Sequence, residues 1–261
     1  MKYLHVSYNS FKRGLVYQFD VIIGFLLVIV VAVSAQFFWK AFANAGKISA
    51  NELDKYVTYS VVAAILSSIF TSEMIAAVSD KIKWGSITSD LQKPVDFQIM
   101  MISETFGEMS SNLLINFIPK MIVMKLIVDI SIPRSIGAFL LFLISALLGY
   151  GVLVAFDYLV SLLAFYFVEI WAFQAMKNAI IGFCSGAYLP LWIFPEAILN
   201  ILNFLPFKYF MFIPLNIYLG ELTGNAAVNA MFAQVLWIAA LTAAGKILTG
   251  IVLKNLTIAG G

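Results

Sequence analysis

The side chains of this chain that could carry chemistry are a few carboxylates set in apolar sequence. Glu104 and Glu108 are four residues apart, so a helix places them on one face. Asp157 follows a long uncharged run and is the best single candidate for a proton relay, although an interhelical hydrogen bond or an inner-interface position is the favoured explanation. Ionisable residues are functional by default only when they lie deep in a membrane, and Glu104 and Glu108 fit an interfacial position equally well.

The sequence contains few of the side chains and motifs that enzyme active sites use. His5 is the single histidine, so a histidine-based triad or a zinc cluster has almost no ligands. Cys184 is the single cysteine, which excludes an intramolecular disulfide or a redox pair. No GxxxxGK[ST] motif is present, so the chain does not bind and hydrolyse ATP in the P-loop manner. We therefore predict no catalytic residue, no metal site and no cofactor in this chain.

The composition is that of a membrane protein. Hydrophobic residues make up 62% of the chain and charged residues 11%, and the mean hydropathy is +0.96. A soluble domain carries about a quarter charged residues. The 261 residues can supply roughly six spanning helices with short connections, and no sizeable soluble domain. The net charge of +2 is too small to indicate nucleic-acid binding. We expect an all-α integral membrane protein with one transmembrane domain over residues 1–261.

The N-terminal residues 2–19 have the pattern of an amphipathic helix that lies in the membrane interface. Lys2, Lys12 and Arg13 fall outside its apolar stripe. An extension of the first span is the alternative, and both explanations place the basic residues in the cytoplasm. The stripe recurs at steps of three and four residues: Leu4, Tyr8, Phe11, Leu15 and Phe19.

Six apolar segments are long enough to be considered as spans. Glu73 is expected near the inner end of the second. Pro119 should kink or end the third, whose Lys120 and Lys125 are expected to reach the outer interface. A turn on the inner side is expected at 169–177, before the fifth. The segments are 21–39, 56–78, 98–128, 135–156 with an apolar continuation to Val168, the run from about Asn178, and 222–245.

The insert 79–97 is the longest polar segment between the early spans. Its Gly85, Ser86 and Pro94 interrupt regular structure, and three lysines accompany them. We expect a short helix on the cytoplasmic side; an ordinary solvated loop is the alternative.

The stretch Phe183 to Gly220 is apolar but repeatedly interrupted by proline. Proline removes a backbone donor and clashes with the preceding turn, so a single straight helix is excluded. We expect a helix that ends near Ser185-Gly186, followed by short broken helices near the membrane surface. Broken backbone at membrane depth survives only where protein buries it or where it lines a wet cavity. The four prolines are Pro190, Pro195, Pro206 and Pro214.

The distribution of basic residues favours cytoplasmic termini and an external position for the proline-rich stretch. Nine basic residues then lie inside: Lys2, Lys12, Arg13, Lys81, Lys83, Lys93, Lys177, Lys246 and Lys254. Five lie outside: Lys40, Lys47, Lys55, Arg134 and Lys208.

Four sets of residues, in this order and spacing, carry a resemblance to a known family. They are Tyr17-Gln18-Phe19-Asp20 with Phe38-Trp39-Lys40, Leu91-Gln92-Lys93-Pro94-Val95, Leu163-Ala164-Phe165, and Ser185-Gly186 followed by Pro190, Pro195, Pro206-Phe207, Pro214 and Tyr218-x-Gly220. Together they resemble the membrane permeases of ABC exporters with the type-2 fold, in the bacterial branch whose six-helix permeases work with a separately encoded ATPase. The charged third span departs from that pattern.

The resemblance implies a role for three segments. Residues 2–19 become an interfacial helix that also touches the ATPase. Residues 80–94 become the inner coupling helix, with the coupling residues Lys83, Trp84, Gly85, Ser86 and Pro94. Residues 186–220 become an outer re-entrant helical hairpin between the last two spans. Its gate residues are Ser185, Gly186, Pro190, Pro195, Pro206, Phe207 and Pro214.

The resemblance also implies an assembly. The permease would pair with a second permease, of the same or a different chain, and with a dimeric ABC ATPase that binds ATP and Mg²⁺. It would export an amphipathic, lipid-like, peptide or drug substrate across a bacterial cell (inner) membrane. A secondary transporter with broken helices is the alternative, and an intramembrane enzyme or a non-transporting assembly protein is a third class. Neither the substrate nor the choice between homodimer and heterodimer follows from the sequence.

Overall fold

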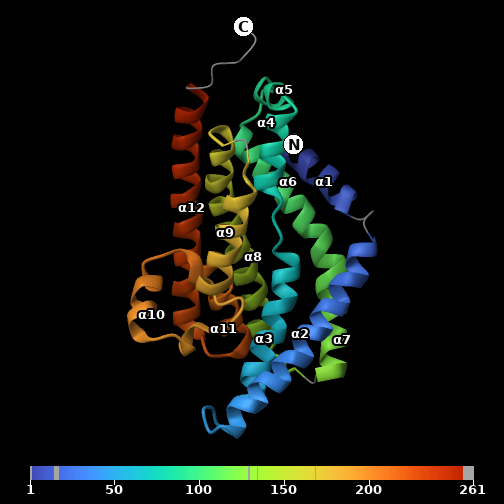
Figure 1. The fold of residues 1–261 in the computed structure, drawn as a ribbon, viewed down its shortest axis with the longest axis vertical. Helices are drawn as coiled ribbons and strands as arrows, with labels where there is room; N and C mark the ends of the chain where they lie inside the picture. Colours follow the sequence, from blue (N-terminus) through green and yellow to red (C-terminus); the bar gives the residue numbers. More distant parts are fainter. Residues whose placement is uncertain (1, 15–17, 129, 134, 168, 255–261) are drawn as a thin grey trace.

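The computed structural model describes residues 2–14, 18–128, 130–133, 135–167 and 169–254. Leu15, Tyr17, Arg134 and Val168, which entered the sequence predictions, lie outside the described residues. Within the described ranges the regular structure is helical, without strands (Figure 1). The expectation of an all-α membrane protein is confirmed.

Five segments of the described chain are long and apolar enough to cross a membrane. They are α2 (Gln18–Asn44), α3 with α4 (Leu53–Ile69 and Met74–Lys83), α6 with α7 (Phe97–Asn112 and Ile118–Val128), α8 (Ile136–Ser161) and α12 (Gly224–Lys254). The remaining expected span, from about Asn178, is α9 (Trp171–Cys184), which has 14 residues. At 1.5 Å per residue it is about 21 Å long, shorter than a bilayer core of about 30 Å.

Two of the long spans are interrupted. The second, expected as one helix over 56–78, breaks at residues 70–73, and α4 starts anew after Glu73. The third contains a π-helical turn over Leu113–Phe117. This turn directly precedes Pro119, whose ring would clash with the carbonyl four residues earlier in a regular α-helix. The kink expected at Pro119 therefore takes the form of a π-helical turn.

One lysine of the third span does not lie where the sequence placed it. Lys120 was expected to reach the outer interface, but it is buried. Its Nζ donates a hydrogen bond to Ser68 Oγ at 3.0 Å and lies 5.6 Å from the centre of the Phe25 ring. Because these partners belong to α3 and α2, the ammonium joins three helices inside the protein.

The helices pack around α8. Its second half is almost wholly buried, and α4, α11 (Phe212–Leu219) and α12 lie against it. On one side α2 packs along α3, and α1 (Lys2–Gly14) packs along α6. The molecule therefore has a central helix with a layer of helices on each side.

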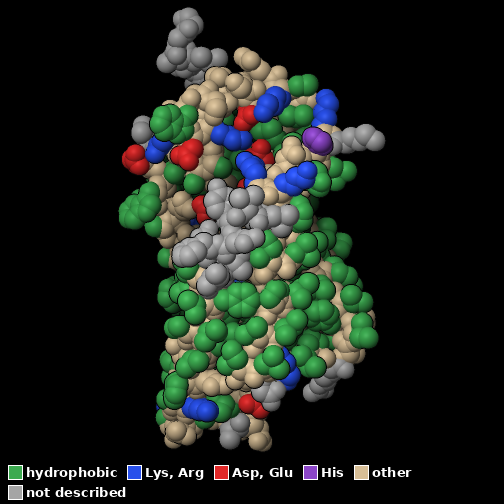
Figure 2. All heavy atoms as spheres, turned by 90° about the vertical axis from the view of Figure 1, so that its right-hand side faces the viewer, with side chains coloured by type: hydrophobic (Ala, Val, Ile, Leu, Met, Phe, Trp, Pro, Cys, Tyr) green, Lys and Arg blue, Asp and Glu red, His purple; other side chains and the backbone are tan. Residues whose placement is uncertain are grey.

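The two ends of the molecule differ. The helices α1 and α5 (Ile87–Leu91) and the end of α12 gather at one end, which we call the α5 end (Figure 1). The short helices α10 (Glu196–Asn203) and α11 lie at the other, the hairpin end. On the face seen in Figure 2, charged side chains gather at the α5 end, and a broad apolar belt lies below them.

Candidate functional site

The segment between α4 and α6 forms an exposed protrusion at the α5 end. Here α4 ends at Lys83, and Trp84 follows with 85% of its surface exposed. Gly85 has φ of +71°, a left-handed conformation that glycine adopts without strain, and Ser86 leads into α5. Aromatic side chains are enriched where proteins contact one another, so Trp84 is a candidate contact residue.

Ion pairs attach this protrusion to two spanning helices. Asp90 of α5 lies 2.6 Å from Lys93 Nζ and 2.8 Å from Lys81 Nζ of α4. Lys81 in turn lies 3.5 Å from Glu104 of α6. Burial alone would raise the pKa of Asp90, but its hydrogen bonds with Lys81 and Lys93 outweigh burial and lower that pKa below its usual value. The carboxylate is therefore charged at neutral pH and holds α5 against α4 and α6.

The base of the protrusion is held by the N-terminal helix and the last span. Pro94 O accepts a hydrogen bond from Lys2 Nζ at 3.5 Å, and the backbone N–H of Asp96 donates to Tyr3 Oη at 2.9 Å. The Asp96 carboxylate caps α6 by accepting from Ile99 N at 3.0 Å and lies 3.6 Å from Lys246 Nζ. The residues from Lys83 to Pro94 that the sequence singled out thus lie in one protrusion, which α1 contacts.

The prolines of the hairpin, residues 186–220, each stand at the start of a short helix. Pro190 precedes η4 (Leu191–Ile193), Pro195 precedes α10, and Pro206 precedes η5 (Phe207–Tyr209). Pro214 lies in the first turn of α11. The first N–H groups of a helix have no intrahelical acceptor, so a proline there loses no hydrogen bond. The sequence therefore builds a chain of short helices.

The root of the hairpin is fixed to α3. Ser185 is fully buried, and Gly186 follows with φ of +82°. The carbonyl of Gly186 accepts a 2.7 Å hydrogen bond from the Tyr59 hydroxyl, and a Cβ at this position would lie 2.6 Å from that hydroxyl oxygen. Only glycine fits this position, both by its backbone conformation and by the space available.

A buried amide that the sequence analysis missed fixes the other side of the hairpin. Gln234 of α12 donates from Nε2 to Tyr209 O at 2.9 Å and to Ser145 O at 3.0 Å. Its Oε1 accepts from Ser145 Oγ at 3.1 Å. Nearby, the ring of Phe207 packs edge-on against Phe156 of α8. The polar Gln234 inside an uncharged last span was the available signal.

A buried ion pair lies between the two ends; the sequence analysis favoured an interhelical bond for Asp157 but missed its partner, Lys177. Asp157 of α8 accepts a hydrogen bond from Lys177 Nζ of α9 at 3.2 Å through Oδ2, and its Oδ1 lies 3.1 Å from the same nitrogen. Both residues are buried. The expectation that Lys177 lies in an inner turn was wrong, because α9 starts at Trp171 and includes it. The interhelical bond, rather than an isolated carboxylate, is the arrangement that the structure shows for Asp157.

The comparisons with known proteins give one finding. No curated protein and no solved structure matches the chain. A family model described as ABC-2 family transporter protein matches residues 29–260, which is most of the chain. The chain therefore belongs to the ABC-2 transporter family, as a membrane permease of an ABC transporter.

Proposed function

We propose that this permease is a subunit of an ATP-driven exporter. It would form half of a translocation pathway with a second permease and couple to a separate ATPase dimer, which binds ATP and Mg²⁺. The observation that carries the proposal is the protrusion around Trp84. It exposes a large aromatic side chain, and the Asp90–Lys81–Glu104 ion pairs connect it to two spans. An exporter with this arrangement has a contact surface for its ATPase and a route for force into the membrane.

The mechanism follows from the break at 70–73. When ATP closes the ATPase dimer, the protrusion is displaced, and the ion pairs carry that displacement into α4 and α6. Because α4 is not continuous with α3, it can tilt against α8 while α3 stays in place. The ATPase must bind the protrusion differently in its two states, since a partner with equal affinity for both drives no change.

The hairpin is the proposed outer gate. Its root is attached to α3 through Tyr59, and its second half to α8 and α12 through Gln234. A relative movement of α3 and α8 would therefore separate these attachments. In this proposal the gate residues from Ser185 to Pro214 act by closing the pathway, without binding substrate themselves.

A secondary transporter is the second candidate. The observation that favours it is the buried Asp157–Lys177 pair next to a broken helix, an arrangement that ion-coupled transporters also use. Transport that continues when cellular ATP is depleted would support this candidate and contradict the exporter.

The sharpest test of the exporter removes the exposed aromatic. Trp84→Ala should reduce the ATPase that co-purifies with the tagged permease, while leaving the amount of inserted permease unchanged. Phe204→Ala is the matched control, because Phe204 is a similarly exposed aromatic, at 83%, but follows α10 at the hairpin end. If no ATPase co-purifies with the parent protein, or if both variants retain it equally, the assignment fails.

The proposed location is a bacterial cell membrane with both termini in the cytoplasm. A cysteine introduced at Glu196 or Asn203 of α10 should then react with a membrane-impermeant maleimide added to intact cells. A cysteine at Thr88 of α5 should react only after the cells are opened. The reverse pattern would invert the orientation.

A further inference from the structure

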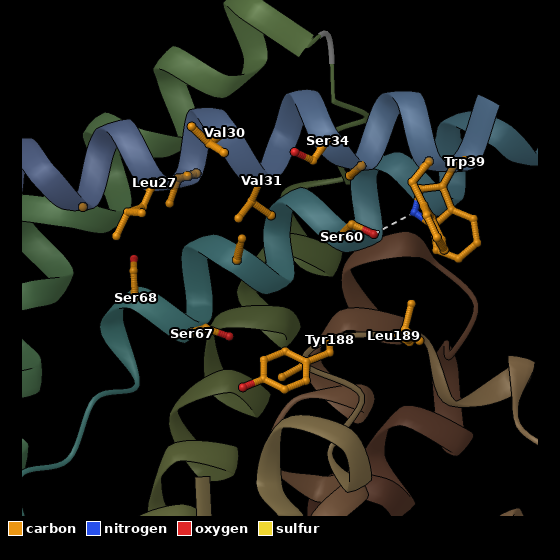
Figure 3. Close-up of a pocket in the computed structure, with 16 residues that line it drawn as sticks. Leu27, Val30, Val31, Ser34, Trp39, Ser60, Ser67, Ser68, Tyr188 and Leu189 are labelled. Atoms are coloured by element: carbon orange, nitrogen blue, oxygen red, sulfur yellow. Dashed lines mark hydrogen bonds between the residues drawn. The ribbon is translucent and has the colours of Figure 1, made fainter. Parts of the chain in front are cut away.

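An apolar groove lies between α2, α3 and the root of the hairpin (Figure 3). Its volume is about 540 Å³, within the range of ligand sites. Leu27, Val30 and Val31 of α2 line one wall, and Ser67 of α3 and Tyr188 lie close together at its lower edge. Leu27 and Val30 are exposed, so the groove is open along the apolar surface of α2.

A second, polar cavity of about 300 Å³ lies at the break in the second span. Its wall includes Glu73, the Asp157–Lys177 pair, and neutral groups such as Gln174 and Asn178. Both oxygens of Asp157 are held by Lys177, at 3.2 and 3.1 Å. The Glu73 side chain is exposed to the cavity and forms no ion pair or hydrogen bond among the described residues, so its carboxylate is available to a polar group of a ligand.

The charge of the polar cavity decides whether the bound polar group is a cation or an anion. Two carboxylates, Glu73 and Asp157, and one ammonium, Lys177, line it, which leaves a net charge of −1. The ammonium is already neutralised by Asp157 at 3.1 Å, so an anion would meet Glu73 without a matching cation. A cation would be attracted to Glu73, whose charge no lysine or arginine of the cavity wall offsets.

The two cavities adjoin. Ser67, Ala187 and Tyr188 line both of them. The Tyr188 ring packs against α9 at Gly182 and edge-on against Phe183. The apolar groove and the acidic cavity thus meet at one aromatic side chain, next to the break in the span and the root of the hairpin.

We propose that the two cavities form one binding site for an amphipath with a cationic head. The alkyl chain lies in the groove along α2, and the ammonium lies in the polar cavity beside Glu73. This inference rests on the proposed transport function, for which it names the substrate class. It also places substrate beside the proposed hinge at residues 70–73, so that tilting of α4 changes the shape of the polar cavity.

The test uses the full chain, with any co-purifying ATPase, in nanodiscs of neutral phospholipid. The probe is radiolabelled dodecyltrimethylammonium, compared with dodecyl sulfate and with neutral dodecyl maltoside. We expect saturable binding of the cation alone. Glu73→Gln should weaken it by about tenfold through the loss of one facing charge, whereas Glu196→Gln, on exposed α10, should leave it unchanged.

A second pair of variants tests the groove. Val31→Trp should abolish saturable binding by filling the groove, whereas Val33→Trp, an exposed position of α2 outside the lining, should not. Equal binding of the sulfate, or a Glu73→Gln variant that binds like the parent, would overturn the site. If the ATPase co-purifies but no saturable cation binding is found, this inference fails while the exporter assignment stands. If the cation binds but no ATPase is found, the exporter assignment fails instead.

Discussion

The protrusion and the hairpin are attached to the same bundle by different kinds of bond. At the α5 end the attachments are charge pairs, with Asp90, Lys81 and Glu104 as members. At the hairpin end they are neutral hydrogen bonds to backbone carbonyls, from Tyr59 and Gln234. Partly exposed charge pairs contribute little stability and weaken with salt, whereas buried neutral hydrogen bonds are costly to leave unmade. The difference indicates an adjustable joint at the proposed coupling surface and a stiff one at the proposed gate.

The Asp157–Lys177 pair lies between the two ends, and breaking it should have the largest effect. Lys177→Met leaves a buried carboxylate without its cation, which costs about 3–5 kcal/mol. Thermal unfolding of the purified protein measures the loss. The double variant Lys177→Met with Asp157→Leu should regain most of it, because no charge is then buried. If Lys177→Met alone is as stable as the parent, the pair does not hold α8 to α9.

Gly186 tests whether the hairpin joint is stiff. Gly186→Ala forces an unfavourable left-handed residue and places a Cβ against the Tyr59 hydroxyl, so we expect a loss of about 2–4 kcal/mol. Gly220→Ala is the matched control, because Gly220 has φ of +77° with no atom near its Cβ position. It should lose only the backbone cost of about 1 kcal/mol. If both variants lower the unfolding temperature equally, the clash with the Tyr59 hydroxyl contributes nothing to the loss of stability.

Asp90→Asn tests whether the joint at the α5 end is adjustable, and it should have the smallest effect. We expect a loss of stability of at most about 1 kcal/mol, which salt reduces. The pKa of Asp90 is lowered in the folded protein, so its contribution is complete above the unfolded value of about 4 and disappears as the pH falls through the folded value. Unfolding of parent and variant at pH 7 and pH 3 measures this. A difference that does not shrink between pH 7 and pH 3, or that grows with salt, would contradict the ion-pair explanation.

Local rules predicted the features that depend on neighbouring residues. The prolines place the short helices of the hairpin, and Gly85 allows the turn of the protrusion, because each acts on the adjacent backbone. The break at 70–73 was not predictable in this way, since the sequence Phe70-Thr71-Ser72-Glu73 contains neither glycine nor proline. It is supported from outside, where the Tyr150 hydroxyl donates to Thr71 O at 3.1 Å.

Long-range pairing explains the remaining errors. Lys120 was assigned to the outer interface because a lysine alone in an apolar segment reaches for water, and Lys177 was assigned to a turn on the inner side. In the structure each finds a partner on another helix, the half-buried Ser68 for Lys120 and the buried Asp157 for Lys177. Which residues meet across helices depends on the packing of the whole bundle, and a single sequence does not encode it in any local pattern.

The length of α4, which has ten residues, determines how far its end would travel if the helix tilted. A helix of this length is about 15 Å long. If it turns about the break at 70–73 by roughly 20°, a typical difference between packed helix orientations, its far end at Lys83 travels about 5 Å. That distance is close to one helical turn. In the proposed mechanism, a displacement of a few ångströms outside the membrane would thus become a change in the angle of α4 beside the polar cavity.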